Sequence, residues 1–339
     1  MTIDTERSSA KYRTAAIDPP EQRLLVTDFR GTEQERDLSE PANCGGLGRI
    51  RHFNRGGSAR WPSNPLPIDP ASRALGLTPE PTMRAQVFQN AVCNWRCWYC
   101  FVPYQLLSAH IEHSSWVTAE ELVARYLAQP NPPLMIDLTG GQPDLTPEWV
   151  LWMMDVLEAQ GLSERVYLWS DDNLSTDYVW RYLSDAEHAR MAAYRNYGRV
   201  CCFKGFDAES FSFNTSAAPE YFDRQFELMG RLLDLGLDLY AYATFTTPST
   251  TAMADAMQRF CDRLQRLDEY LPLRLVPLEV QVFTPVERRM RPVMHSAMEH
   301  QYQAIELWQR ELERRFSSTA RAWNIADVPL RGRTRCHVA

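Results

Sequence analysis

The sequence lacks the long apolar runs that membrane-spanning segments need. No stretch approaches the roughly 20 consecutive apolar residues with which a helix crosses a bilayer. Residues 1–7 also lack the apolar core of a secretory signal peptide. We therefore expect a protein that stays in the cytoplasm.

The sequence also lacks an excess of positive charge. Its 36 Lys and Arg residues stand against 43 Asp and Glu residues, which gives a formal net charge of −7 at pH 7. A net negative protein has no general attraction for nucleic acid or anionic lipid, although a local basic groove is compatible with this total. The 339 residues are enough for one large domain or two smaller ones.

Cysteine has the most informative distribution. Three of the eight cysteines, Cys93, Cys97 and Cys100, have the spacing C-x3-C-x2-C, and the aromatic residue Tyr99 precedes the third. Thiolates are soft ligands that select iron–sulfur clusters or zinc. Because a closed structural site needs four protein ligands, three thiolates would leave one iron of a cubane cluster open to a small molecule. The alternatives are a zinc knuckle without its fourth ligand and three buried cysteines that bind no metal.

This stretch resembles the signature of the radical S-adenosylmethionine (SAM) superfamily, C-x3-C-x-aromatic-C. The resemblance implies a [4Fe–4S] cluster on the three cysteines, with SAM bound to the fourth iron. It also implies reductive cleavage of SAM to a 5′-deoxyadenosyl radical that abstracts a hydrogen atom from a substrate, with an electron donor such as flavodoxin or ferredoxin as partner. Tyr99 is expected beside the adenine of SAM, and Trp95 and Trp98 as an apolar jacket around the cluster.

Residues 1–85 differ in composition from the rest of the chain. They contain seven of the 15 glycines and a group of four prolines between residues 62 and 70. Helical or alternating periodicity is weak in this part. We therefore predict an irregular N-terminal extension.

From residue 86 onward, strand-like runs alternate with amphipathic helices. The predicted strands are 86–92, 134–138, 166–169, 200–203, 239–245 and 273–283. Predicted helices follow the capping residue Thr118, Thr146 and Pro219, and two longer ones cover 250–269 and 291–316. Alternation of this kind predicts a parallel sheet with right-handed crossovers. Six units fit the partial (β/α)6 TIM-like barrel that the resemblance implies, here over 86–290, with a C-terminal helix and tail at 291–339.

A second motif follows the strand predicted at 134–138. Its sequence is Thr-Gly-Gly-Gln-Pro, and it resembles the Gly-Gly-Glu-Pro motif that holds the SAM amino group in the superfamily. Gly140 and Gly141 allow close backbone approach to a ligand. Gln142 replaces the glutamate, and its amide oxygen can still accept a hydrogen bond from an ammonium, without charge assistance. The resemblance therefore implies that these three residues contact SAM.

Polar residues also follow the third and fourth predicted strands. The resemblance implies that Ser170, Asp172 and Asn173 contact the ribose and carboxylate of SAM, and a helix N-cap is the alternative. Lys204 follows an apolar strand, where an ammonium is costly unless it meets an anion. We expect that anion to be the SAM carboxylate or an acidic residue at the barrel mouth, with Asp172 as the nearest candidate by strand order, and a surface lysine is the alternative. The stretch is similar to a strand of the glycyl-radical-activating branch, in which an acid occupies the position of Cys202.

The other cysteines give weaker signals. Cys261 lies in a helical pattern and is expected to be a small buried side chain. Cys201 and Cys202 are adjacent on a strand and so must face opposite sides of the sheet. Cys44 and Cys336 could ligate a second cluster, but no C-x2-C spacing supports this.

These observations favour a radical SAM enzyme that acts on a small molecule, in a biosynthetic pathway. Members with further clusters have cysteine-rich C-terminal extensions, whereas this chain has one cysteine after residue 261. Activation of a partner protein and modification of a peptide or RNA are alternatives. A non-catalytic iron–sulfur or zinc-binding protein is another. The sequence does not distinguish oxidoreductase, lyase and transferase chemistry.

Overall fold

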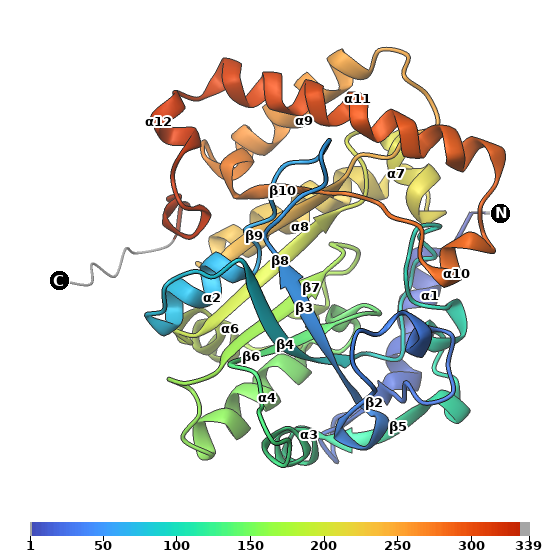
Figure 1. Ribbon diagram of the computed structural model, residues 1–339. Coiled ribbons are helices and arrows are strands. Elements are labelled where there is room, and N and C mark those ends of the chain that lie inside the picture. Colours follow the sequence, from blue (N-terminus) through green and yellow to red (C-terminus); the bar gives the residue numbers. More distant parts are fainter. Residues whose placement is uncertain (1, 333–339) are drawn as a thin grey trace.

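The computed structural model describes residues 2–332, and it shows a mixed α/β fold built on one curled sheet (Figure 1). The sheet has seven strands in the order β10-β9-β8-β7-β6-β4-β3, and it forms a half-barrel. A three-stranded sheet, β1-β2-β5, accompanies it. The expected partial TIM-like barrel is therefore confirmed.

Six strands of the half-barrel are parallel and correspond in order to the six predicted strands. They are β4 (Thr82–Gln89), β6 (Met135–Thr139), β7 (Tyr167–Asp172), β8 (Tyr197–Phe203), β9 (Leu239–Thr244) and β10 (Leu275–Leu278). Strand β10 is shorter than the predicted 273–283. The amide of Gln301 hydrogen-bonds both the N–H and the C=O of Val280, at 3.0 and 3.2 Å, so that a side chain replaces the strand ladder there.

The longer predicted helices are also present. They are α3 (Ala119–Leu127), α4 (Glu148–Ala159), α8 (Tyr221–Asp234), α9 (Met253–Leu267) and α11 (Pro292–Arg315). The predicted capping box is confirmed, because the Thr118 hydroxyl accepts from the Glu121 N–H at 3.2 Å and the Glu121 carboxylate accepts from the Thr118 N–H at 3.0 Å. Shorter helices fill the connections: α5 (Tyr178–Tyr182), α6 (Asp185–Ala193), α7 (Ala208–Thr215), α10 (Thr284–Glu287) and α12 (Ser318–Arg321).

Residues 2–85 are more regular than predicted. They form α1 (Thr5–Ala16), β1 (Ile17–Asp18), β2 (Arg23–Thr27), β3 (Gly48–Asn54) and α2 (Ile68–Leu75). Strand β3 pairs antiparallel with β4 and extends the half-barrel, while β2 pairs with β5 (Ser114–Thr118). The prediction of an irregular extension is wrong for these segments, because the partners of β2 and β3 lie far along the chain and local patterns do not reveal them.

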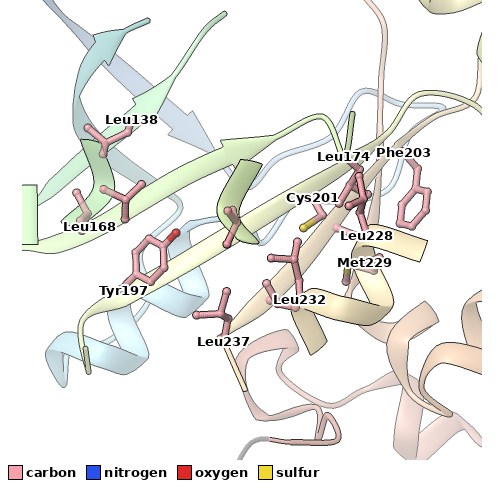
Figure 2. Close-up of a cluster of buried hydrophobic side chains, with 14 of the residues drawn as sticks. Leu138, Leu168, Leu174, Tyr197, Cys201, Phe203, Leu228, Met229, Leu232 and Leu237 are labelled. Atoms are coloured by element: carbon pink, nitrogen blue, oxygen red, sulfur yellow. The ribbon is translucent and has the colours of Figure 1, made fainter. Parts of the chain in front are cut away.

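The two faces of the sheet bury different side chains. On the outer face, Cys201 and Phe203 of β8 lie beside Leu228 and Met229 of α8 (Figure 2). On the concave face, Cys202 packs in a separate cluster that includes Trp169 and Tyr242. The predicted opposite orientation of Cys201 and Cys202 is therefore confirmed.

The remaining cysteines are consistent with packing roles where the structure describes them. Cys261 is fully buried in the outer core, as predicted, and Cys44 is also buried. Cys336 lies outside the described residues. None of the helices within residues 2–332 has the length and apolarity of a bilayer-spanning segment.

Candidate functional site

The three cysteines lie on one loop, residues 93–100, which we call the cysteine loop. It follows β4 at the carboxyl end of the parallel strands, where α/β folds collect their functional groups. The Cys93 N–H donates to the Leu107 carbonyl at 3.1 Å, and the Trp98 N–H donates to the Asn214 carbonyl at 3.2 Å. Trp95 and Trp98 are 1% and 4% exposed. Backbone bonds and buried indole rings therefore fix the course of the loop.

Arg96 holds the loop from within. Its guanidinium donates to the carbonyls of Cys93 at 2.5 Å and Trp95 at 2.9 Å, and to the Tyr12 hydroxyl at 2.6 Å. The Trp95 indole N–H also donates to a residue of α1, the hydroxyl of Thr5, at 3.0 Å. Sequence reasoning missed Arg96, although a charged residue between two cysteines in an otherwise aromatic stretch was a signal.

The thiols of the loop are largely withdrawn from solvent. Cys93 is 8% exposed, and Cys97 and Cys100 are half-buried. Burial raises the pKa of Cys93, and raises the pKa of Cys97 to about 12, while the positive charge of Lys204 opposes both shifts. Within residues 2–332, no three His, Cys, Asp or Glu side chains converge as ligands of one metal ion. A cubane cluster places each thiolate on a different iron, so such convergence is not required of it.

Asn173 points at one of these sulfurs. Its side-chain amide N lies 3.9 Å from Cys93 Sγ and donates to the Asn94 side-chain oxygen at 3.1 Å. The backbone carbonyl of Asn173 accepts from the Gln225 amide at 2.8 Å, which fixes the residue from the other side. Amide N–H groups near thiolates stabilise their charge and orient them on a metal. The alternative N-cap role is not found, because the next helix, α5, begins only at Tyr178.

The two glycines join the second motif to the cysteine loop. Gly140 and Gly141 have φ angles of +71° and +63°, a region that favours glycine. A Cβ on Gly141 would lie 2.4 Å from the carbonyl oxygens of both Asn90 and Val92. The next N–H, that of Gln142, donates to the Val92 carbonyl at 2.7 Å. The close approach predicted for these glycines is therefore made to the chain that enters the cysteine loop.

Both the NH2 group and the oxygen of the Gln142 side-chain amide form hydrogen bonds with other residues of the protein. Its NH2 donates to the Asp172 carboxylate at 2.8 Å, and its oxygen accepts from the Asn173 N–H at 2.9 Å. The Ser170 hydroxyl lies 2.7 Å from the Tyr197 hydroxyl and is fully buried. This geometry favours a supporting role for Gln142, Ser170 and Asp172 beneath Asn173 over direct contact with a ligand.

Asp172 belongs to a buried ion triad. Its carboxylate lies 3.2 Å from the guanidinium of Arg199, which also pairs closely with Asp144. The three side chains are at most 2% exposed. Burial raises the pKa of Asp144 well above its usual value, and the charge of Arg199 opposes the shift. Sequence reasoning missed Arg199 and Asp144, although an arginine inside an apolar strand is a signal for buried ion pairing.

Lys204 stands on the other face of the sheet from Asp172. Within residues 2–332, its half-buried ammonium has no hydrogen-bond or ion-pair partner. Burial lowers the pKa of Lys204, whereas its electrostatic interactions with Cys202, Tyr99 and Cys97 raise it, and the net shift is well above the usual value. The expected pairing with Asp172 is wrong. Because side chains alternate along β7, Asp171 shares the face of Lys204, and Asp172 points away to Arg199.

Tyr99 connects the cysteine loop to the end of β9. Its hydroxyl lies 3.0 Å from the Thr244 hydroxyl, and its ring meets that of Trp98 edge-on at 5.6 Å. Tyr99, Lys204 and the three cysteines therefore meet at the carboxyl ends of β4, β8 and β9. The position of Tyr99 beside adenine stays a prediction.

No protein-family model matches the chain, and no curated protein matches it. Among solved structures it is similar to Streptococcus suis SuiB bound to precursor peptide SuiA, with 15% identity, a TM-score of 0.36, and coverage of 57% of this chain and 48% of that one. It is also similar to SuiB bound to S-adenosylmethionine, with 17% identity, a TM-score of 0.35, and coverage of 56% and 48%. The chain thus spans about half the length of these structures.

Proposed function

We propose that this chain is a radical SAM enzyme in which Cys93, Cys97 and Cys100 hold a [4Fe–4S] cluster. When bound, the reduced cluster supplies the electron that splits SAM to methionine and a 5′-deoxyadenosyl radical, which abstracts a hydrogen atom from the substrate. The observation that carries the proposal is the meeting of three thiols with the unpaired ammonium of Lys204 at the carboxyl ends of parallel strands. A low-potential electron donor such as flavodoxin or ferredoxin is the partner that this chemistry needs.

The other residues have distinct roles in this proposal. Lys204 binds the carboxylate of SAM in this proposal, since its ammonium lacks a partner within the described residues and an ammonium after a buried strand is costly unless it meets an anion. Asn173 donates to the sulfur of Cys93, Gln142 holds the backbone N–H of Asn173, and Asp172 holds the amide of Gln142. Ser170 supports this layer through its bond to Tyr197. Gly140 and Gly141 keep the second motif against the cysteine loop.

The substrate in this proposal is a small molecule. Part of the concave face is covered by α2, whose Ile68 and Ala71 pack into the same cluster as Met135 and Trp169. A peptide or a partner protein is the alternative, which binding measurements with the loaded enzyme would detect.

Anaerobic reconstitution tests the proposal. The chain should take up about four irons, because three thiolates and SAM complete one cubane. With a one-electron reductant and SAM it should release methionine and 5′-deoxyadenosine. Cys97→Ala should lose both the iron and the cleavage, whereas Cys261→Ala, which removes a buried thiol on α9, should keep both. Stoichiometric zinc without SAM cleavage would refute the assignment.

A further inference from the structure

A second group of charged side chains lies on the concave face, apart from the cysteines. We call Arg49, Arg51, Asp137 and Asp171 the concave charge cluster. Arg49 of β3 is opposite Val87 of β4, and Val87 is opposite Asp137 of β6, so the side chains of Arg49 and Asp137 share one face of the sheet. Asp137 is in turn opposite Trp169, which packs in the concave-face core. The cluster therefore extends from β3 to β7, across four neighbouring strands in the interior of the half-barrel.

Two members of this cluster are buried without hydrogen bonds. Arg49 is 6% exposed, and neither its Nε nor its Nη2 has a partner. Asp137 is fully buried, and neither carboxylate oxygen accepts a hydrogen bond. Buried polar atoms without partners are rare in native proteins and call for a specific explanation. Here four such atoms lie on one face of the sheet.

The unpaired nitrogens of Arg49 indicate what kind of ligand would bind there. Nε and Nη2 form the side-on edge of a guanidinium, which binds both oxygens of a carboxylate. The rings of Phe29 and Phe101 lie 5.9 and 5.4 Å from the Arg49 guanidinium and help to keep it in place. Since Phe101 directly follows Cys100, the contact with its ring places the Arg49 guanidinium close in space to the end of the cysteine loop.

The Asp137 carboxylate lacks a hydrogen-bond donor, and Arg51 is only a distant ion-pair partner. The guanidinium of Arg51 lies 3.7 Å from the Asp137 carboxylate, too far for a hydrogen bond, and Arg51 is one-third exposed. A ligand ammonium could displace Arg51 towards solvent. Two arginines and two aspartates give the cluster a formal charge of zero, so a ligand with no net charge leaves the buried charges balanced.

We propose that Arg49 and Asp137 form a substrate subsite for an α-amino acid or the free α-amino acid end of a larger small molecule. Arg49 binds the carboxylate through Nε and Nη2, and Asp137 accepts hydrogen bonds from the α-ammonium. The proposal rests on the radical SAM function of the neighbouring site and names its substrate class.

The test uses the twenty proteinogenic L-amino acids, each at 10 mM, as probes of the full chain. At least one should raise the thermal unfolding midpoint and give a saturation-transfer NMR signal, whereas acetate and methylammonium, the separate halves, should do neither at the same concentration. Arg49→Lys keeps the positive charge but cannot bind a carboxylate in the bidentate way, so it should reduce the probe affinity at least tenfold. Asp137→Asn should have an effect of the same size. Arg84→Met, which removes an exposed arginine from the neighbouring strand β4, should not change it. Absence of a response to all twenty probes, or an unchanged affinity in both variants, would overturn the proposal.

A second measurement needs no ligand. Charges kept without partners for function cost stability, so Arg49→Met combined with Asp137→Leu should raise the unfolding midpoint of the ligand-free protein. A lower midpoint would show that the two side chains stabilise the fold, and would overturn the proposal. Iron content and SAM cleavage without substrate are measured in parallel. If the cysteine site fails, these are lost while the amino acid response persists, and if the subsite fails, they persist while the response is absent.

Discussion

The buried triad of Asp144, Arg199 and Asp172 supports the sharpest energetic prediction. Arg199→Met keeps most of the side-chain volume and removes the charge that neutralises two carboxylates, all at most 2% exposed. Removing one partner of a buried pair costs about 3–5 kcal/mol, because the remaining charge is left uncompensated. We expect a loss in this range in the free energy of unfolding, measured by urea titration of the metal-free protein at pH 8.

The loss should depend on pH with a defined sign. Burial already raises the pKa of Asp144 in the folded state. A carboxyl with a raised folded pKa binds more protons when folded, so its contribution to stability is present at low pH and is lost as the pH rises through that pKa. Without Arg199, whose charge opposes this shift, the pKa of Asp144 should rise further. The deficit of the variant relative to the wild type should therefore be smaller at pH 5 than at pH 8.

A surface triad provides the matched control. Arg190 pairs with Asp155 at 2.6 Å and Glu158 at 2.8 Å, with its side chain 39% exposed. Arg190→Met should cost at most about 1 kcal/mol, because exposed ion pairs are screened by solvent. A deficit for Arg199→Met no larger than that of Arg190→Met, or one that does not change between pH 5 and pH 8, would refute the reasoning.

Three further predictions concern the candidate site. Lys204→Met should weaken SAM binding by tenfold or more in a calorimetric titration, as for loss of a charged hydrogen bond of about 1.5–3 kcal/mol, while Lys11→Met should bind normally. Gly141→Ala should lower the thermal midpoint more than Gly161→Ala, because both have positive φ but only the first new Cβ meets backbone atoms, at 2.4 Å. Gln142→Glu should lower stability by about 1–3 kcal/mol in urea, since it sets a carboxylate against the one that Gln142 now binds, and a variant as stable as wild type would contradict this.

Much of the fold could be predicted because its signals are local. Thr118 and Glu121 form the capping box that their spacing indicates, and each parallel strand from β4 to β9 begins and ends within a few residues of an apolar run. Strand β3 could not be predicted, because its partner β4 lies across a segment that contains α2. The end of β10 depends on a hydrogen bond from Gln301 that no local pattern reveals.

The residues of the candidate site also divide into those that local sequence predicts and those that depend on distant contacts. The three cysteines lie within eight residues of one another, so they share one loop. The pairing of Lys204 with Asp172 was wrong because β7 carries large side chains on both faces, and its sequence does not reveal which aspartate faces the concave side. Arg49 had no motif at all. The register of β3 against β4 decides that its buried guanidinium lies on the concave face of the half-barrel.

The position of Lys204 has a practical consequence. The chain contains 34 arginines and only two lysines, Lys11 and Lys204, and Lys11 is exposed on α1. Reductive methylation with 13C-formaldehyde would therefore label one lysine side chain in the candidate site and one exposed lysine side chain on α1. The methyl signal of Lys204 would report the charge of whatever binds beside the cysteine loop, and that of Lys11 would serve as an internal reference in the same sample.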